Sequence, residues 1–300
     1  MPKVSVILPI YNVAPYLDDA FQSLLNQTFS DFEVIAINDG STDNSQEYID
    51  RYMSIDPRIS CHYQNNKGLS EARNTGMKYI KGDYVYFMDS DDILEETALE
   101  KCYTYAIANN ADVCLFDAKL FYEEGAIPIT WDYNRSRVLE ENKRYEGLSL
   151  FTYLLQTGMH RAVVWLQFIK WSYLKELNLS FYPGIIHEDE LFTPQLIIQT
   201  SRIYYIKETF IKHRIRKSSI QGKGYSKQNI SCYLTVFDEL FNFQNSDIIR
   251  QFAQYTLSKV FYTGHTIPFV DKFSVFLRAM LSGYLKYIGL KSILVFWLKR

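Results

Sequence analysis

The sequence predicts an α/β fold in which a mostly parallel sheet is flanked by helices and followed by a C-terminal helical extension. Short apolar segments alternate with helical patterns over residues 1–116, the pattern is mixed over 117–225, and helical periodicity dominates 226–300. Repeated strand–helix units form parallel sheets with right-handed crossovers. We therefore expect residues 1–116 and 117–225 to be two halves of one α/β domain, with 226–300 appended to it.

Five short apolar segments in the first half have the length and composition of buried strands. They are Val4–Pro9, Phe32–Ile37, Ile59–Tyr63, Tyr84–Met88 and Val113–Phe116. Apolar residues recur at helical spacing between these segments, which predicts helices at 17–25, around 48–52, from about residue 70, and at 98–108.

Farther along the chain the pattern predicts three helices, near 148–155, 172–177 and 190–199, and extended segments at 203–206 and 209–214. Helical spacing returns beyond residue 226. One apolar stripe there consists of Phe273, Phe276, Leu277, Met280, Leu281 and Tyr284. Such a stripe usually packs against a core or a second subunit, although basic, aromatic helices also lie on anionic membranes.

The charges are distributed unevenly along the chain. Residues 251–300 contain seven Lys or Arg residues and one acid, whereas residues 1–250 contain 25 basic and 33 acidic residues. We therefore favour contact of residues 251–300 with a membrane surface, and the sequence leaves a homodimer open. The basic residues lie in an aromatic helical region without a nucleic-acid-binding motif, so we expect no nucleic acid partner.

The composition is that of a globular protein from a reducing compartment. Of the 300 residues, 47% are hydrophobic and 22% are charged. Cys61, Cys102, Cys114 and Cys232 lack paired spacing, which argues against a zinc site. Because no apolar run reaches the roughly 18–20 residues of a membrane span, we expect a cytoplasmic protein, peripheral at the inner face of the cell membrane if residues 251–300 bind lipid.

The end of the fourth predicted strand carries the strongest chemical signal. Tyr84–Met88 leads directly into Asp89-Ser90-Asp91-Asp92. In open α/β sheets, ligands bind outside the carboxyl ends of the strands. Crowded carboxylates there need a cation, and hard divalent ions such as Mg²⁺ or Mn²⁺ take oxygen ligands and bridge to phosphates. The cluster therefore predicts a metal–nucleotide site.

Two other predicted strands end in residues suited to a nucleotide. Pro9-Ile10-Tyr11-Asn12 follows the first strand, where an aromatic ring can stack on a heterocycle, and Asp39 ends the second, where it can accept a hydrogen bond from a base. Asn66-Lys67-Gly68 opens the helix that carries Arg73, and both a helix N-terminus and an arginine favour a diphosphate. Each feature also has an ordinary structural explanation as a turn, an N-cap or a surface ion pair.

Two polar segments in the second half have two interpretations each. Glu188-Asp189 precedes an apolar helix, where adjacent acids usually stabilise the helix dipole but can also supply a general base. The segment 213–219, His-Arg-Ile-Arg-Lys-Ser-Ser, combines an imidazole, cations and hydroxyls. It is either a solvated loop or a cover over phosphates.

A resemblance to a known family emerges when these motifs are taken in order. The chain resembles family-2 glycosyltransferases of the GT-A type, in particular bacterial capsule, lipopolysaccharide and cell-wall polysaccharide enzymes. The segments that carry the resemblance are PIYN, NDGSTD, NKGLSEARN, YVYFMDSDD, IIHEDELF and HRIRKSSI. It covers residues 9–92 strongly and continues weakly to about residue 220.

The resemblance implies a GT-A (Rossmann-like) fold, a UDP-sugar donor, a Mn²⁺ or Mg²⁺ cofactor and inversion at the anomeric carbon. The implied acceptor is a saccharide or a lipid-linked saccharide. The transferred sugar, the acceptor's identity and the linkage position depend on variable loops that the motifs do not cover.

The same resemblance implies roles for residues that contact the donor. Tyr11 would stack on uracil, Pro9 would shape its pocket, and Asp39 would contact the base edge. Arg73 would approach the diphosphate. The other residues implied on the nucleotide-sugar side are Asn12, Asn66, Lys67, Gly68, Asp89 and Ser90, with Arg216 and Ser219 closing over the diphosphate.

The metal ligands are implied in the same way. Asp91 would bind the metal, and Asp92 would support that carboxylate. Asp89 would face the ribose or a metal-bound water, and His213 stands where a third ligand would be.

On the acceptor side the resemblance implies a base and an aromatic contact. Asp189 would deprotonate the acceptor hydroxyl, oriented by Glu188. Trp165 matches an acceptor-side aromatic, but Leu166-Gln167 follow it where relatives carry other polar residues. A buried core tryptophan is the alternative.

Three other classes of protein compete with a glycosyltransferase. A phosphatase or phosphotransferase of the haloacid-dehalogenase kind carries its acids after the first strand, whereas here they follow the fourth. A nucleotidyltransferase would usually have a Gly-rich, basic loop after its first strand, which the segment PIYNVAPY lacks. A non-catalytic nucleotide-sugar-binding or scaffold protein remains, and UDP release with sugar acceptors would distinguish it.

Overall fold

The computed structural model describes residues 1–217 and 225–299, which fall into two compact units. The sheet unit comprises Met1–Gly184 and Phe192–Lys217, and the helical unit comprises Ile185–Leu191 and Ser218–Arg300. The predicted halves 1–116 and 117–225 lie mainly in the sheet unit. The resemblance implies that residues 1–116 bind the nucleotide sugar and residues 117–225 bind the acceptor, and this division stays a prediction.

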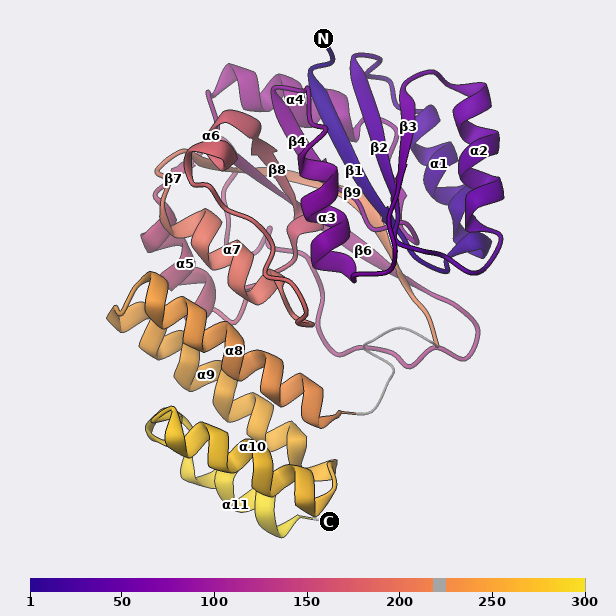
Figure 1. Cartoon of the computed structure of the whole chain (residues 1–300). Helices are drawn as coiled ribbons and strands as arrows, with labels where there is room; N and C mark the ends of the chain where they lie inside the picture. The colour runs from indigo at the N-terminus through magenta and orange to yellow at the C-terminus, as the bar shows by residue number, and fades with distance from the viewer. Residues whose placement is uncertain (218–224, 300) are drawn as a thin grey trace. The chain divides into compact units, whose positions relative to one another are not determined.

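The sheet unit is built on a mixed sheet with nine strands among the described residues (Figure 1). The strands are β1 (Val4–Ile10), β2 (Phe32–Asn38), β3 (Ile59–Tyr63), β4 (Tyr84–Phe87), β5 (Ile93–Leu94), β6 (Val113–Tyr122), β7 (Arg144–Tyr145), β8 (Gln167–Lys170) and β9 (Ile203–Ile215). Their order is β3-β2-β1-β4-β8-β6-β9-β5, and β7 pairs with β9. The first four strands are mutually parallel, as expected from the strand–helix repeats.

The sheet departs from an all-parallel arrangement at β8. This strand lies between β4 and β6 and is antiparallel to both. It has four residues, Gln-Phe-Ile-Lys, and follows a 3-10 turn, η2 (Val164–Leu166). Four residues are too few to give a clear period-two pattern, which is why the sequence did not reveal this strand.

Helices cover both faces of the parallel part of the sheet (Figure 1). The helices of the sheet unit are α1 (Leu17–Leu25), α2 (Ser45–Ile55), α3 (Leu69–Met77), α4 (Ala98–Ala108), α5 (Gly147–Gln156), α6 (Trp171–Glu176) and the main part of α7 (Asp189–Ile198), with the 3-10 helix η1 (Ala14–Tyr16) before α1. Alternate residues of β1 face opposite sides, as a strand requires. Val6 and Leu8 join the core with Phe21 of α1, whereas Ile7 lies beneath α3, where a Cβ on Gly76 would come within 2.6 Å of it.

A buried ion pair fixes the pairing of β6 with β9. Asp117 lies at a bulge in β6, where the parallel register with β9 shifts. Arg135 and Asp117 have 2% and 4% of their side chains exposed, and Nε of the arginine lies 3.4 Å from Oδ1 of the aspartate. Tyr205 of β9 donates its hydroxyl hydrogen to the same carboxylate. This network therefore sets the course of β9 toward its end, which carries His213.

The helical unit contains α8 (Lys227–Phe243), α9 (Asp247–Thr263), α10 (Phe269–Leu281) and α11 (Leu290–Leu298), with 3-10 helices η4 (Gly264–Thr266) and η5 (Tyr284–Tyr287). A capping box of Ser226 and Asn229 begins α8. Phe237 of α8 packs edge-on against Phe252 of α9, with ring centroids 5.3 Å apart. In the part of the chain that the structure describes, no helix is both long and apolar enough to cross a membrane.

Replacing Asp117 with alanine should lower the free energy of unfolding by about 3–5 kcal/mol, because it leaves the Arg135 charge buried without its partner. Urea denaturation monitored by circular dichroism measures this free energy of unfolding. The control is Asp132→Ala, which removes an exposed pair with Arg137 (46% and 70% of the side chains exposed) and should change stability by less than about 1 kcal/mol. Equal effects of the two substitutions would contradict a structural role for the buried pair.

Candidate active site

The topology of the parallel strands places the candidate site at their carboxyl ends. The chain moves outward from β1 to β2 and β3, and then returns to the other side of β1 as β4. The direction of strand order therefore reverses at β1. Ligands of open α/β sheets bind outside the carboxyl ends of the strands at such a point. The segments that follow β1, β2 and β4 are the three that the sequence singled out.

The segment after β1 presents an aromatic ring and is held in place by its neighbour. Tyr11 is 49% exposed. Asn12 adopts a left-handed conformation with φ of 52°, and its Oδ1 accepts hydrogen bonds from the backbone N–H groups of Thr42 (2.7 Å) and Asp43 (3.3 Å). Asn12 thus joins the ends of β1 and β2, while Pro9 lies within β1. The contacts that the sequence predicted for Pro9, Tyr11 and Asn12 with a nucleotide stay predictions.

Asp39, which follows β2, organises the loop that leads to α3. Its Oδ1 accepts hydrogen bonds from Gln64 Nε2 (2.7 Å) and the Lys67 N–H (2.9 Å), and its Oδ2 accepts one from the Gly68 N–H (2.8 Å). A carboxylate has about four acceptor positions. Three of them are occupied by these donors, so Asp39 retains capacity for one further N–H group such as that of a base.

Glycine is needed at two points of this loop region. Gly68 precedes the first turn of α3 with φ of 88° and ψ of 169°, a backbone region open to essentially no other residue. Gly40 has φ of 72°, and a Cβ there would lie 2.7 Å from the backbone nitrogen of Asn66. Asp39 and Gly40 therefore bring the loop containing Asn66 and Lys67 against the end of β2.

Arg73 lies within α3 and reaches the end of β4. Its side chain is 2% exposed and its Nη2 donates to Asp89 Oδ1 (3.1 Å). Its guanidinium carbon lies 5.0 Å from the ring centre of Phe181. Arg73 therefore fixes the orientation of the first carboxylate of the acidic cluster. The predicted approach of Arg73 to a diphosphate is not tested by this contact.

The other two carboxylates of the cluster are paired with groups from the end of β9. Asp91 Oδ2 lies 2.8 Å from Arg216 Nη2. Asp92 is 1% exposed; its carboxylate lies 2.9 Å from His213 Nδ1 and accepts the Arg214 N–H at 2.9 Å. Ser90, between them, is 5% exposed. The acidic segment 89–92 is thus held from two sides by α3 and β9.

Burial and mutual repulsion make these carboxylates reluctant to ionise. Burial, reinforced by the neighbouring Asp92 carboxylate, raises the pKa of Asp91 to about 6. Burial also raises the pKa of Asp92. For His213, burial acts to lower the pKa, but contact with Asp92 outweighs it and the pKa is raised. Additional positive charge at the carboxyl end of β4 would stabilise the ionised carboxylates.

The residues at the end of β4 fit a hard divalent ion only as part of a larger ligand set. Among the described residues, no group of three or more His, Cys, Asp or Glu side chains is arranged to hold a metal. Mg²⁺ is usually bound by one or two carboxylates, with water and substrate phosphates completing the shell. Asp91 and Asp89 supply oxygen donors of that kind. The third protein ligand predicted at His213 has its Nδ1 directed to Asp92, and its role toward a metal stays a prediction.

Trp165, predicted to contact an acceptor, lies in the core. It is 3% exposed, and its ring stacks on that of His213 with centroids 4.6 Å apart and planes 18° apart. Tyr133 packs edge-on against the same indole at 4.8 Å. In this structure Trp165 therefore packs against one face of the His213 ring. Its contact with an acceptor stays a prediction.

The predicted base lies in the helical unit. Asp189 is the first residue of α7, and Glu188 precedes it. In the same loop, His187 has a left-handed φ of 68°; its Nε2 lies 3.2 Å from Asn229 Nδ2, and its ring stacks on Tyr233 with centroids 4.5 Å apart. Burial lowers the pKa of His187, so the neutral ring can accept the Asn229 hydrogen bond. Two residues of α8 thus anchor the loop that carries the predicted base.

Several residues of the site escaped the sequence analysis because their partners are distant in sequence. Gln64 bridges Asp39 and Thr75, but it precedes the recognised motif. Tyr16 has the guanidinium groups of Arg214 and Arg216 each 5.0 Å from its ring centre. An aromatic residue after a strand gives no local sign of such contacts. Ser219, predicted to close over the diphosphate, lies outside the described residues.

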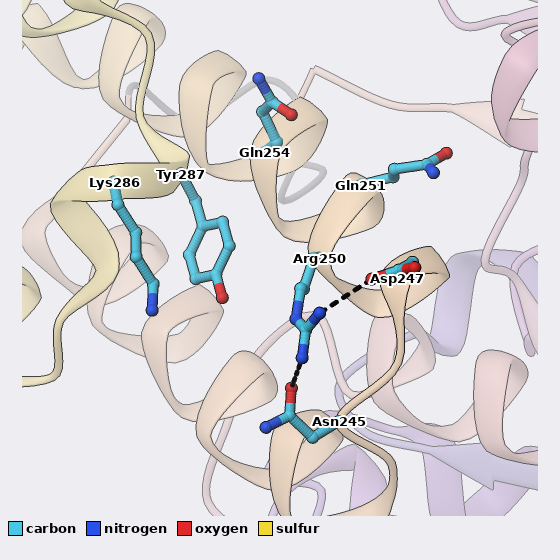
Figure 2. Close-up of a pocket in the computed structure, with 7 residues that line it drawn as sticks. All are labelled: Asn245, Asp247, Arg250, Gln251, Gln254, Lys286 and Tyr287. Carbon is cyan, nitrogen blue, oxygen red and sulfur yellow. Dashed lines mark hydrogen bonds and ion pairs between the residues drawn. The ribbon is translucent and has the colours of Figure 1, made fainter.

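A separate hollow of about 620 Å³ opens in the helical unit and contains none of the predicted site residues. It is lined by Asn245, Asp247, Arg250, Gln251, Gln254, Lys286 and Tyr287. Figure 2 shows that Arg250 is already engaged by Asp247 (2.8 Å) and Asn245 (3.0 Å). The arginine of this lining is therefore already paired.

Comparison with known proteins assigns the chain to a family. The sequence model of glycosyl transferase family 2 matches residues 5–160. The glycosyltransferase GlyA of Streptococcus pneumoniae serotype 4 is 32% identical over 225 residues, which are 73% of this chain and 31% of that protein. The glycosyltransferase YibD of Escherichia coli K12, described as uncharacterized, is 30% identical over 218 residues, 73% of this chain and 63% of its own. The chain belongs to glycosyl transferase family 2, and it spans less than two thirds of the length of either relative.

The solved structures confirm the predicted GT-A type of fold. The crystal structure of Staphylococcus aureus TarS, residues 1–349 in complex with UDP-GlcNAc, superposes with a TM-score of 0.69 at 20% identity, covering 98% of this chain and 83% of that one. At this identity the likeness concerns the fold.

If the uridine nucleotide predicted from the motifs binds at the carboxyl ends of the strands, replacing Gly40 with alanine should weaken binding of uridine diphosphate by roughly tenfold, about 1.4 kcal/mol. The added Cβ would clash with the Asn66 backbone and displace the loop that Asp39 organises. Calorimetry measures the affinity. Gly125→Ala is the matched control, because Gly125 also has a positive φ (78°) but no atom within 4 Å of its Cβ position. Unchanged affinity in the Gly40 variant would show that this loop does not form the nucleotide pocket.

Proposed function

We propose that the chain is an inverting glycosyltransferase that moves a hexose or N-acetylhexosamine from a UDP-sugar to a saccharide acceptor, in the synthesis of a bacterial surface polysaccharide. The observation that carries the proposal is the acidic segment 89–92 at the carboxyl end of β4, compensated by Arg73, Arg216 and His213. Family membership supports the reaction class. The UDP-GlcNAc in the TarS structure supports a uridine nucleotide as donor.

The proposed reaction is a single displacement at the anomeric carbon. An acceptor oxygen bonds to C1 of the sugar as the bond from C1 to the diphosphate oxygen breaks, and the acceptor proton passes to a base. Asp189, oriented by Glu188, is the proposed base. One carboxylate is sufficient because the departing diphosphate needs no proton, unlike the alcohol that leaves in glycoside hydrolysis.

The residues at the end of β4 would handle the negative charge that develops on the leaving group. Asp91 and Asp89 would hold a Mn²⁺ or Mg²⁺ ion together with phosphate oxygens. When bound, the ion would offset the charge on the diphosphate. Arg216 lies beside Asp91, and its buried Nε has no hydrogen-bond partner among the described residues. A phosphate oxygen that reached this buried N–H would supply the acceptor that it lacks.

The role of Asp189 is tested by Asp189→Asn. A positioned base contributes about 10²–10⁴-fold, so the turnover rate should fall by that factor, or about 3–5 kcal/mol in the barrier. Binding of UDP should survive. A UDP-release assay with Mn²⁺ and lipid-linked mono- and disaccharide acceptors measures the rate.

The matched control is Asp247→Asn. Asp247 is also the first residue of a helix in the helical unit, so this variant reports the loss of a helix-dipole interaction together with an exposed ion pair to Arg250. Wild-type turnover by the Asp189 variant would eliminate Asp189 as the base. If the wild-type chain bound UDP but released none from any UDP-sugar in the screen, the alternative of a non-catalytic nucleotide-sugar-binding protein would replace the proposal.

The role of the acidic segment is tested by Asp91→Ala. The variant should lose most of the increase in UDP affinity that Mn²⁺ gives the wild-type chain, because one of its two proposed carboxylate ligands is gone. The control is Asp83→Ala at the opposite end of the same strand, where Asp83 pairs with Lys3 at the surface. Calorimetry with Mn²⁺ and with a chelator measures both. An unaltered Mn²⁺ effect in the Asp91 variant would rule out Asp91 as a ligand.

A further inference from the structure

The stripe predicted on the last helices is directed away from the core of the helical unit, except at Tyr284, which is 6% exposed, and at the partly buried Phe276. In α10 the residues turned inward are Lys272, Val275 and Ala279. Arg278 fixes the same helix to α8, donating to the Ser231 carbonyl (3.0 Å) and to Asp238 (2.9 Å). The opposite side of α10 is apolar and exposed. Its residues and their exposed fractions are Phe269 (71%), Val270 (78%), Phe273 (60%), Leu277 (38%), Met280 (48%) and Leu281 (76%).

The last helix extends this apolar surface. In α11, Phe296 is buried against Phe261 of α9, with ring centroids 5.0 Å apart. Leu290, Leu294 and Leu298 are 73%, 49% and 75% exposed. They recur every four residues and therefore share one side of the helix.

Trp297 makes the two exposed sides continuous. Its ring centre lies 5.7 Å from that of Phe269 and 5.3 Å from that of Phe276, both on α10. Figure 1 shows α10 and α11, in yellow, side by side within the helical unit. We call the nine exposed residues of the two helices the α10–α11 face. Contiguous apolar surfaces of this kind mark interaction sites rather than ordinary surface.

The charges next to the α10–α11 face indicate what covers it. Residues 251–300 carry seven basic residues and one acid, although Lys272 is buried and Arg278 is paired with Asp238. That acid, Asp271, is 3.7 Å from Lys227. Lys286, Lys291 and Lys299 are exposed on the segment that forms η5 and α11. A second copy of this chain would bring the same positive charges together, whereas an anionic surface would attract them.

We propose that the α10–α11 face docks the chain onto an anionic lipid bilayer. The helices lie in the plane of the interface, the apolar side chains enter the boundary between headgroups and acyl chains, and the lysines contact lipid phosphates. Because the attachment rests on surface contacts of two helices, it is reversible. The inference concerns only the helical unit and holds whether or not the proposed transfer reaction is correct.

The experiment is sedimentation of the full chain with vesicles of phosphatidylcholine alone or mixed with phosphatidylglycerol. The wild-type chain should bind the mixed vesicles, and added salt should weaken that binding. The triple variant Phe273→Ser, Leu281→Ser, Leu294→Ser should bind them at least about tenfold more weakly, because three large apolar side chains no longer enter the lipid. Since all three are at the surface, the variants should fold, which circular dichroism checks.

The matched control is Ile55→Ser with Ile107→Ser, which removes exposed isoleucines (59% and 52%) from the sheet unit. This variant should bind vesicles like the wild type. Equal partitioning of the wild-type chain and the triple variant would overturn the proposal. So would light scattering that shows a wild-type dimer, monomeric in the triple variant, with no vesicle binding by either, because the occupant of the face would then be a second copy.

Discussion

The structure depends on the crowding of three carboxylates at the end of one short strand. Asp89, Asp91 and Asp92 follow β4 within four residues, and their charges repel one another. Each is compensated by a different group: Arg73 from α3, Arg216 after β9, and His213 within β9. The sheet order brings β4 next to β1, so this charge lies where the strand order reverses. An anionic ligand can approach such a cluster only if further positive charge comes with it, and for that reason a cation and a diphosphate are expected there together.

The rest of the sheet unit holds this cluster in place. The buried Asp117–Arg135 pair fixes the β6–β9 register. Because His213 lies on β9, this register places its ring next to Asp92. Trp165 stacks on one face of the same imidazole ring. On the donor side, Asp39 ties the loop 64–68 to the end of β2 through three hydrogen bonds. The positions of the strand ends are thus determined by buried polar contacts, which tolerate little displacement when a partner is removed.

The sequence predicted those parts that carry a local signal. The first four strands, the helix at Ala98–Ala108 and the position of the acidic segment all agree with the structure, because each has a clear apolar period or a distinctive cluster. It did not predict β8, whose four residues show no period. Nor did it predict that Asp92 meets His213, 121 residues away, since long-range partners depend on the sheet order. The stripe on α10 was visible as a pattern, but only the burial of Lys272 on the opposite side reveals that the stripe faces outward.

The most direct test of the account is a crystal structure of the chain with uridine diphosphate and Mn²⁺, with anomalous diffraction used to locate manganese. The account predicts a manganese peak at the carboxyl end of β4, within bonding distance of an Asp91 carboxylate oxygen and of a diphosphate oxygen, with the uracil against Tyr11. The account would be contradicted if the nucleotide bound elsewhere, or if it bound at the carboxyl end of β4 with no manganese beside Asp91.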